Sequence, residues 1–160
     1  MDRVNRILHN PKYRECVEKN RKYEEERIFC RHDMSHFLDV ARLSWIENLE
    51  KGLGIEKELI YAAALLHDCG RFRQYEDGTP HELAGTQLAE EILFDCGFEE
   101  PEREEILRAI SGHREKKLAQ EASLRGVLYR ADKKSRPCFA CPAEGACSWP
   151  PSKKNLLLKW

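Results

Sequence analysis

Apolar residues recur every three or four positions along almost the whole chain, and no segment alternates in the manner of a β-strand. This spacing predicts helices over residues 11–27, 35–52, 56–70, 81–97, 99–112 and 118–135. The segment 71–80 is predicted to be a loop with a turn at Asp77-Gly78. The fold class expected from the pattern is all-α, a compact helical bundle.

The chain of 160 residues is long enough for one domain with a real core, which we place at residues 1–136. Its 41% hydrophobic and 34% charged residues exclude a disordered protein, and the net charge of -1 does not favour a nucleic-acid polymer or a membrane as partner. No stretch approaches the roughly 18 apolar residues of a membrane span, and the first residues lack a secretory h-region. We therefore expect a cytoplasmic protein, in which an oligomer remains open.

Several helices carry a polar, ligand-type side chain on the apolar stripe that should face the core. These residues are His36, His67, His81, His113 and Asp132. Asp68 stands beside His67. Burying unpaired carboxylates is costly, so a positive partner is needed. A single inward histidine is more often a satisfied core residue, but five such helices together predict a divalent Zn, Fe, Mn, Co or Ni ion.

The order of these residues is similar to a family pattern. His36, the pair His67-Asp68 and Asp132, in the contexts "HFLDVARL", "AALLHDCGRF" and "YRADKKSR", resemble the H…HD…D signature of the HD-domain metal-dependent phosphohydrolase superfamily over about residues 30–136. The resemblance implies a helical fold in which these four residues hold one divalent metal. It also implies that His81 and His113 complete a second position, as in binuclear members, with Asp68 shared by two ions.

The function that follows is a phosphohydrolase acting on a small phosphoester, with a nucleotide as the candidate substrate. A bound cation lowers the pKa of water from 15.7 towards about 7 and so supplies hydroxide. Besides Asp68, the expected catalytic residues include Arg31 and Arg71 as phosphate contacts, because arginine can grip two oxygens at once. His32 could orient a ligand or protonate a leaving group.

Two other functions fit the same residues. Mixed-valent di-iron oxygenases of the HD superfamily have the ligand order H…HD…H…H…D, which this chain matches equally well. The basic residues near the ligands lean towards phosphate, but the ligands alone do not separate the two reactions. A non-catalytic sensor that keeps the metal for structure is the third interpretation, and the completeness of the ligand set argues against it.

The segment 137–160 is rich in proline and cysteine and is expected to be an irregular extension packed on the domain, with Trp149 and Trp160 against the domain or a partner chain. Cys138, Cys141 and Cys147 are spaced C-x2-C-x5-C, and the first pair has the spacing of a zinc knuckle or an iron–sulfur half-site. Free thiols are the favoured interpretation. A zinc site is the alternative, and its fourth ligand would have to come through the fold from one of three other cysteines: Cys16, Cys30 or Cys69.

Overall fold

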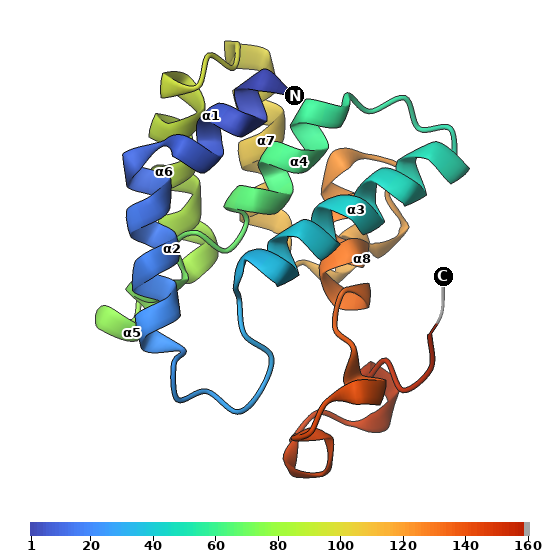
Figure 1. Ribbon diagram of the computed structural model, residues 1–160. Helices are drawn as coiled ribbons and strands as arrows, with labels where there is room; N and C mark the ends of the chain where they lie inside the picture. The colour runs from blue at the N-terminus through green and yellow to red at the C-terminus, as the bar shows by residue number, and fades with distance from the viewer. Residues whose placement is uncertain (159–160) are drawn as a thin grey trace.

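The computed structural model describes residues 1–158, and its regular elements within this range are all helical (Figure 1). The α-helices are α1 Asp2–His9, α2 Pro11–Tyr23, α3 Met34–Glu50, α4 Lys57–Leu66, α5 Arg71–Glu76, α6 His81–Asp95, α7 Glu100–Gly112 and α8 Leu124–Lys134. Four short 3-10 helices are also present in this range: η1 Lys116–Gln120 lies between α7 and α8, and η2 Cys138–Ala140, η3 Glu144–Ala146 and η4 Pro151–Lys153 come after α8. The predicted all-α class is confirmed. None of the helices in this part of the chain combines the length and hydrophobicity needed to cross a lipid bilayer.

Side chains at the helix starts explain several boundaries. The Asn10 side chain accepts hydrogen bonds from the first backbone N–H groups of α2, and Pro11 occupies the first turn. Asp33 caps α3 by accepting from the His36 backbone N–H at 3.0 Å, and Ser123 caps α8. These caps set where α3 and α8 begin, and both helices carry residues of the predicted metal site.

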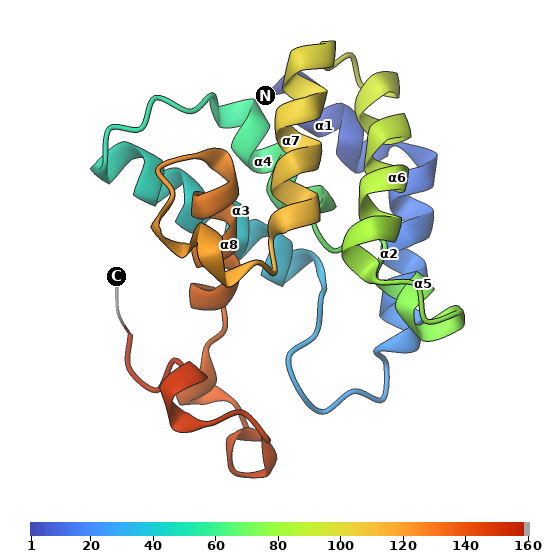
Figure 2. The ribbon, with the colours of Figure 1, turned by 180° about the vertical axis from the view of Figure 1, so that it is seen from behind.

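The core lies around α4, which packs against α1, α3, α7 and α8 (Figures 1 and 2). The run Ala62 to Ala64 is fully buried, and these small side chains allow the neighbouring helices to approach. On the far side, α6 and α7 form a second packed pair that also contacts α4. The last turn of α4, where the HD pair follows, therefore points into the middle of the bundle.

Three element predictions were wrong in detail. The predicted loop 71–80 contains the short helix α5, and six residues are too few to show a helical period. The predicted helix 11–27 ends at Tyr23, and the first part of 118–135 is the 3-10 helix η1 followed by a bend. The helix α1 was not predicted.

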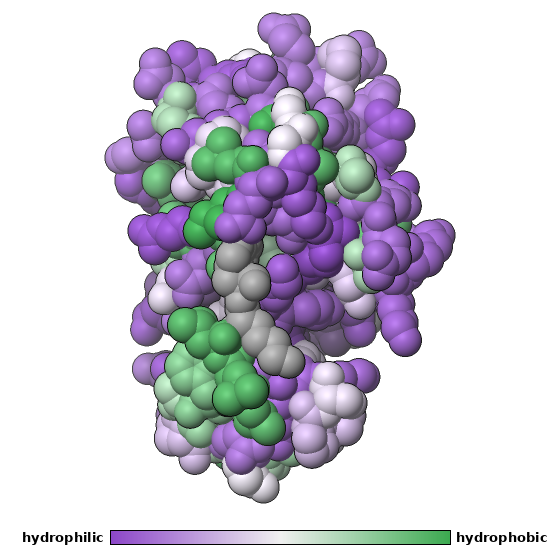
Figure 3. All heavy atoms as spheres, turned by 90° about the vertical axis from the view of Figure 1, so that its right-hand side faces the viewer, coloured by the Kyte–Doolittle hydropathy of each residue, from purple (hydrophilic) through white to green (hydrophobic). Residues whose placement is uncertain are grey.

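The C-terminal segment 137–158 lies at one end of the bundle, next to the end of α8 (Figure 1). The Asn155 side chain donates to the backbone carbonyls of Lys133, Lys134 and Arg136 at 2.8, 3.3 and 3.0 Å. The Arg136 guanidinium lies 4.4 Å from the centre of the Trp149 ring. Trp160 is outside the described residues. Apolar side chains gather on this end of the surface (Figure 3). Within the C-terminal segment, Leu157 is exposed.

Candidate metal centre

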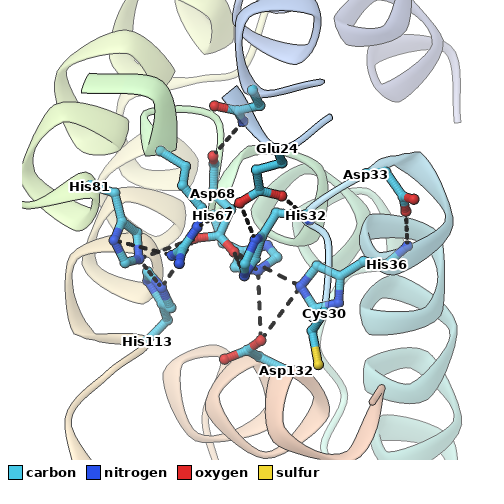
Figure 4. A network of polar contacts seen from close by, with 12 residues as sticks. Glu24, Cys30, His32, Asp33, His36, His67, Asp68, His81, His113 and Asp132 are labelled. Atoms are coloured by element: carbon cyan, nitrogen blue, oxygen red, sulfur yellow. Dashed lines mark hydrogen bonds and ion pairs between the residues drawn. The ribbon is translucent and has the colours of Figure 1, made fainter. Parts of the chain in front are cut away.

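The ends of five helices converge on one point and bring together the side chains that the sequence singled out (Figure 4). His36 comes from the first turn of α3, and His67 and Asp68 directly follow α4. His81 begins α6, His113 follows the last turn of α7, and Asp132 lies near the end of α8. Except for His36, which is nearly buried, all these residues are buried.

Their ligand atoms form two groups, each with all atoms within 4.8 Å of one another. The first group is His36, His67 and Asp132, and the second group is Asp68, His81 and His113. Asp68 faces both: its Oδ2 lies 3.2 Å from His67 Nε2, and its Oδ1 lies 3.1 Å from His81 Nε2. The two oxygens of one carboxylate therefore point at two adjacent positions, as expected for a carboxylate shared by two ions.

Backbone carbonyls fix the rings of two histidines. His67 Nδ1 lies 2.7 Å from the carbonyl oxygen of Ala64, and His113 Nδ1 lies 2.6 Å from that of Ile110. Because a carbonyl can only accept, Nδ1 carries the proton in both rings. The lone pair of each imidazole is therefore on Nε2, which faces the centre, in the arrangement that metal-binding histidines generally show.

Side chains, and not backbone carbonyls, fix the other two rings in the same orientation, with Nδ1 as the donor. Gln74 Oε1 accepts from His81 Nδ1 at 2.6 Å. The Ser135 hydroxyl donates to the Asp132 carbonyl, so its oxygen is left to accept from His36 Nδ1 at 3.2 Å. All four histidines of the centre thus turn Nε2 inward, and Nε2 is the acceptor atom whenever the ring is neutral.

Polar atoms without a partner mark the middle of the centre. His36 Nε2, His67 Nε2, Asp68 Oδ1 and Asp132 Oδ1 are buried and make no hydrogen bond. Each such atom costs roughly 1–3 kcal/mol when left unsatisfied. Four of them, one from each residue of the H…HD…D pattern, directed at one small volume fit a site for a cation.

The protonation states also suit metal binding. Burial lowers the pKa of His36 to about 3 and that of His113 to about 4, so both rings are neutral at pH 7. Burial alone would raise the pKa of Asp68 and of Asp132, but the neighbouring His67 outweighs it and both values fall below the usual range. Burial opposes charge on His67, but Asp68 raises its pKa. The centre therefore offers two carboxylates and at least two neutral imidazoles.

Comparison with known proteins agrees with this geometry. The family model described as HD domain matches residues 34–136, a range that contains all six residues of the two groups. The chain belongs to the HD domain family. It is 46% identical over 158 residues to an uncharacterized protein of Clostridium beijerinckii, which covers 99% of each chain.

A named relative matches a smaller share of the chain. Ribonuclease Y of Lawsonia intracellularis is 31% identical over 99 residues, which are 62% of this chain and 17% of that protein. The chain thus spans a small part of this relative. No solved structure matches.

The HD centre opens into a cavity of about 950 Å³ between the bundle and the C-terminal segment. Its lining includes His32, Asp68, His81, His113 and Asp132. Nine lysines and arginines line it, against three acidic residues, of which two belong to the centre itself. The basic lining is Arg27, Arg71, Arg114, Lys116, Lys133, Lys134, Arg136, Lys153 and Lys154. This excess of positive charge favours an anionic ligand.

The predicted phosphate contacts are placed differently from each other. Arg71 lines the cavity, with its Nη1 3.9 Å from Asp68 Oδ1. Arg31 is exposed and does not line the cavity; its guanidinium donates to the carbonyls of Arg27 and Glu25. The structure does not bring Arg31 to the cavity, because the residue lies in the non-helical segment before α3, where helical spacing gives no direction; its role as a phosphate contact stays a prediction.

His32 lies beside the first group but outside helix α3. Its Nε2 is 3.8 Å from Asp68 Oδ2, and its Nδ1 is 2.7 Å from Glu24 Oε1. Glu24 also accepts from the Arg71 Nε at 3.2 Å and from the Tyr75 hydroxyl at 2.8 Å. Burial alone would raise the pKa of Glu24, but the bond to His32 lowers it below the usual range. A buried carboxylate thus orients both His32 and Arg71.

Sequence reasoning missed two residues that hold the centre, one in the last turn of α2 and one directly after that helix. Glu24 is one, and Asn20 is the other: its side-chain amide donates to the Asp68 carbonyl at 2.9 Å and accepts from the Phe72 N–H at 2.7 Å. Both are buried. They lie in the charged stretch "EKNRKYEEER", which is typical of a solvent-exposed helix. The one available signal was that a polar residue falls, at helical spacing, on the inward face.

Proposed function

We propose that this HD-domain protein is a metal-dependent phosphohydrolase that cleaves a small phosphoester, with a nucleotide as the candidate substrate. The observation that carries the proposal is the pair of buried ligand groups, joined by Asp68 and facing a cavity lined by nine basic residues. A metal centre alone would fit many reactions. The basic wall beside it favours a phosphorylated substrate.

The residues fit one or two divalent ions. His36, His67, Asp68 and Asp132 would hold the first, and Asp68, His81 and His113 the second. Imidazole and carboxylate donors suit Mn, Fe, Co, Ni or Zn. When bound, such ions lower the pKa of water towards about 7 and polarise phosphoryl oxygens.

Two residues of the chain act on the substrate in this proposal. Arg71 binds a phosphoryl oxygen, because its guanidinium lines the cavity and its Nε is fixed by Glu24. His32 holds a proton for the leaving oxygen. Its Nδ1 is bound to Glu24, so proton exchange takes place at Nε2, on the side of Asp68.

Cavity size and the named relative add support. A volume of about 950 Å³ is at the upper end of the roughly 300–1,000 Å³ of small-molecule pockets, so it has room for a nucleotide. The name ribonuclease Y describes an enzyme that cleaves RNA, whose backbone is linked by phosphodiesters. That likeness supports phosphoester chemistry.

The test is hydrolysis without oxygen. Protein stripped by a chelator and reloaded separately with Mn, Co, Ni, Zn or Fe is assayed anaerobically on an aryl phosphodiester and a panel of nucleotides. We expect turnover that Asp68→Asn abolishes and that Asp39→Asn, at a half-exposed position on α3, leaves unchanged. Substrate consumption that needs both iron and oxygen would overturn the proposal in favour of the oxygenase.

A further inference from the structure

The cysteines of the chain divide into two sets. Cys16, Cys69 and Cys96 are buried in the core. The other four, Cys30, Cys138, Cys141 and Cys147, are partly exposed and line the same cavity. Cys30 comes from the segment between α2 and α3, more than a hundred residues before the C-terminal three. The fold thus supplies to the C-x2-C-x5-C motif the fourth cysteine that the motif lacks by itself.

The sulfurs of this second set are close enough to influence one another. Burial raises the pKa of the Cys30 thiol, Arg136 lowers it, and the nearby Cys138 and Cys141 raise it again. The pKa of Lys154 is raised mainly by its hydrogen bond to Glu144, and further by Cys147 and Cys138.

The backbone around the motif presents the sulfurs in short turns. The Cys141 N–H donates to the Cys138 carbonyl at 3.2 Å, which closes η2 between them. The Cys147 N–H donates to the Glu144 carbonyl at the end of η3. Arg136 and Lys154 stand beside the cysteines and would offset the negative charge of thiolates.

We propose that Cys30, Cys138, Cys141 and Cys147 bind a four-thiolate metal centre, separate from the histidine centre, and that its occupant is an iron–sulfur cluster. The absence of three of these sulfurs within 4.8 Å of one another favours a larger occupant than a single zinc ion. Sulfurs bound to a single zinc at about 2.3 Å lie only about 3.8 Å apart. Among residues 1–158, the groups of three ligand atoms within 4.8 Å are the two histidine and aspartate groups alone, so these sulfurs stand wider apart. A four-iron cluster takes one thiolate at each iron and spans more space.

The centre would hold the wall of the cavity in place. The C-terminal segment contributes Trp149, Lys153, Lys154 and Asn155 to the lining. Cys30 lies two residues before His32, so the metal would join this segment to the loop that carries His32. The inference does not depend on which reaction the histidine centre performs.

The experiment measures iron, zinc and acid-labile sulfide in full-length protein purified anaerobically, before and after reconstitution with iron and sulfide. We expect about four iron and four sulfide per chain beyond the metal of the histidine centre, with broad visible absorption. Cys141→Ser and Cys30→Ser should lose the sulfide, whereas Cys96→Ala, a cysteine outside the cavity, should keep it. Asp68→Asn should lose the other metal and keep the sulfide, so failure of the two centres can be told apart.

Two results would count against the inference. Stoichiometric zinc without sulfide, lost in Cys141→Ser, would keep the four ligands and overturn the iron–sulfur assignment. Wild-type protein that takes up neither zinc nor iron and sulfide at these cysteines would overturn the site itself. The second result is measured on wild-type protein, so a variant that fails to fold cannot obscure it.

Discussion

The two ligand groups predict that metal can be removed from each position separately. His113→Ala should empty the position formed by the second group, and His36→Ala should empty that of the first group. Asp68→Ala should empty both, because each of its oxygens faces a different group, at 3.2 Å from His67 Nε2 and 3.1 Å from His81 Nε2. The three variants therefore distinguish two adjacent metal positions that share one carboxylate from a single large metal position.

The size of the effect follows from linkage. An ion present at a hundred times its Kd stabilises the folded chain by about 2.7 kcal/mol per site. A domain of this length gains about 2–4 °C in Tm for each kcal/mol. Adding metal to stripped protein should therefore raise the Tm by roughly 11–22 °C in the wild type, roughly 5–11 °C in His113→Ala, and not at all in Asp68→Ala.

The assay is calorimetry of each variant with chelator and with metal, alongside metal content by mass spectrometry. Because each shift is measured within one variant, the stability lost through the substitution itself cancels. His9→Ala is the matched control, since His9 is the one histidine outside the cluster that includes His32, and its ring is hydrogen-bonded to the Asn5 carbonyl. A full one-site shift retained in Asp68→Ala, or both shifts lost in His113→Ala, would refute the assignment.

Other substitutions test the packing of the helices and the basic lining of the cavity. A Cβ at Gly70 would stand 2.2 Å from the Gly85 backbone nitrogen, so Gly70→Ala should lower the free energy of unfolding by about 3 kcal/mol in urea titration. Glu47→Gln should cost about 3 kcal/mol because it leaves Arg130 without its buried carboxylate partner. The pKa of Glu47 is lowered, since its cationic partners outweigh burial; its contribution is therefore present above pH 4.5 and lost as the pH falls, so the two denaturation curves should converge in acid. Arg71→Ala should raise KM for a phosphoester about 10- to 100-fold, the equivalent of roughly 1.5–3 kcal/mol. A similar rise in KM in Arg73→Ala, at an exposed position, would contradict this.

The sequence predicted the ligands because two patterns coincide in it. Helical periodicity identifies the inward face, and a histidine or aspartate on that face is conspicuous, as at His67 and Asp132. The same logic could not place Arg31, which lies in a segment without a period, or α5, which is shorter than two turns. It also could not find Glu24, because a carboxylate among charged neighbours carries no sign of burial until the fold brings His32 to it.

The two hydrogen bonds of Asn20 have a practical consequence for the limits of the domain. The match to the HD family begins at residue 34, yet Asn20 ties the Asp68 carbonyl to the Phe72 N–H from a helix that precedes it. A chain trimmed to residues 34–136 would keep all six ligand side chains and lose the strut that sets the turn on which Asp68 sits. An intact metal centre in this protein thus needs more of the chain than the family match covers, and α2 belongs to the scaffold of that centre.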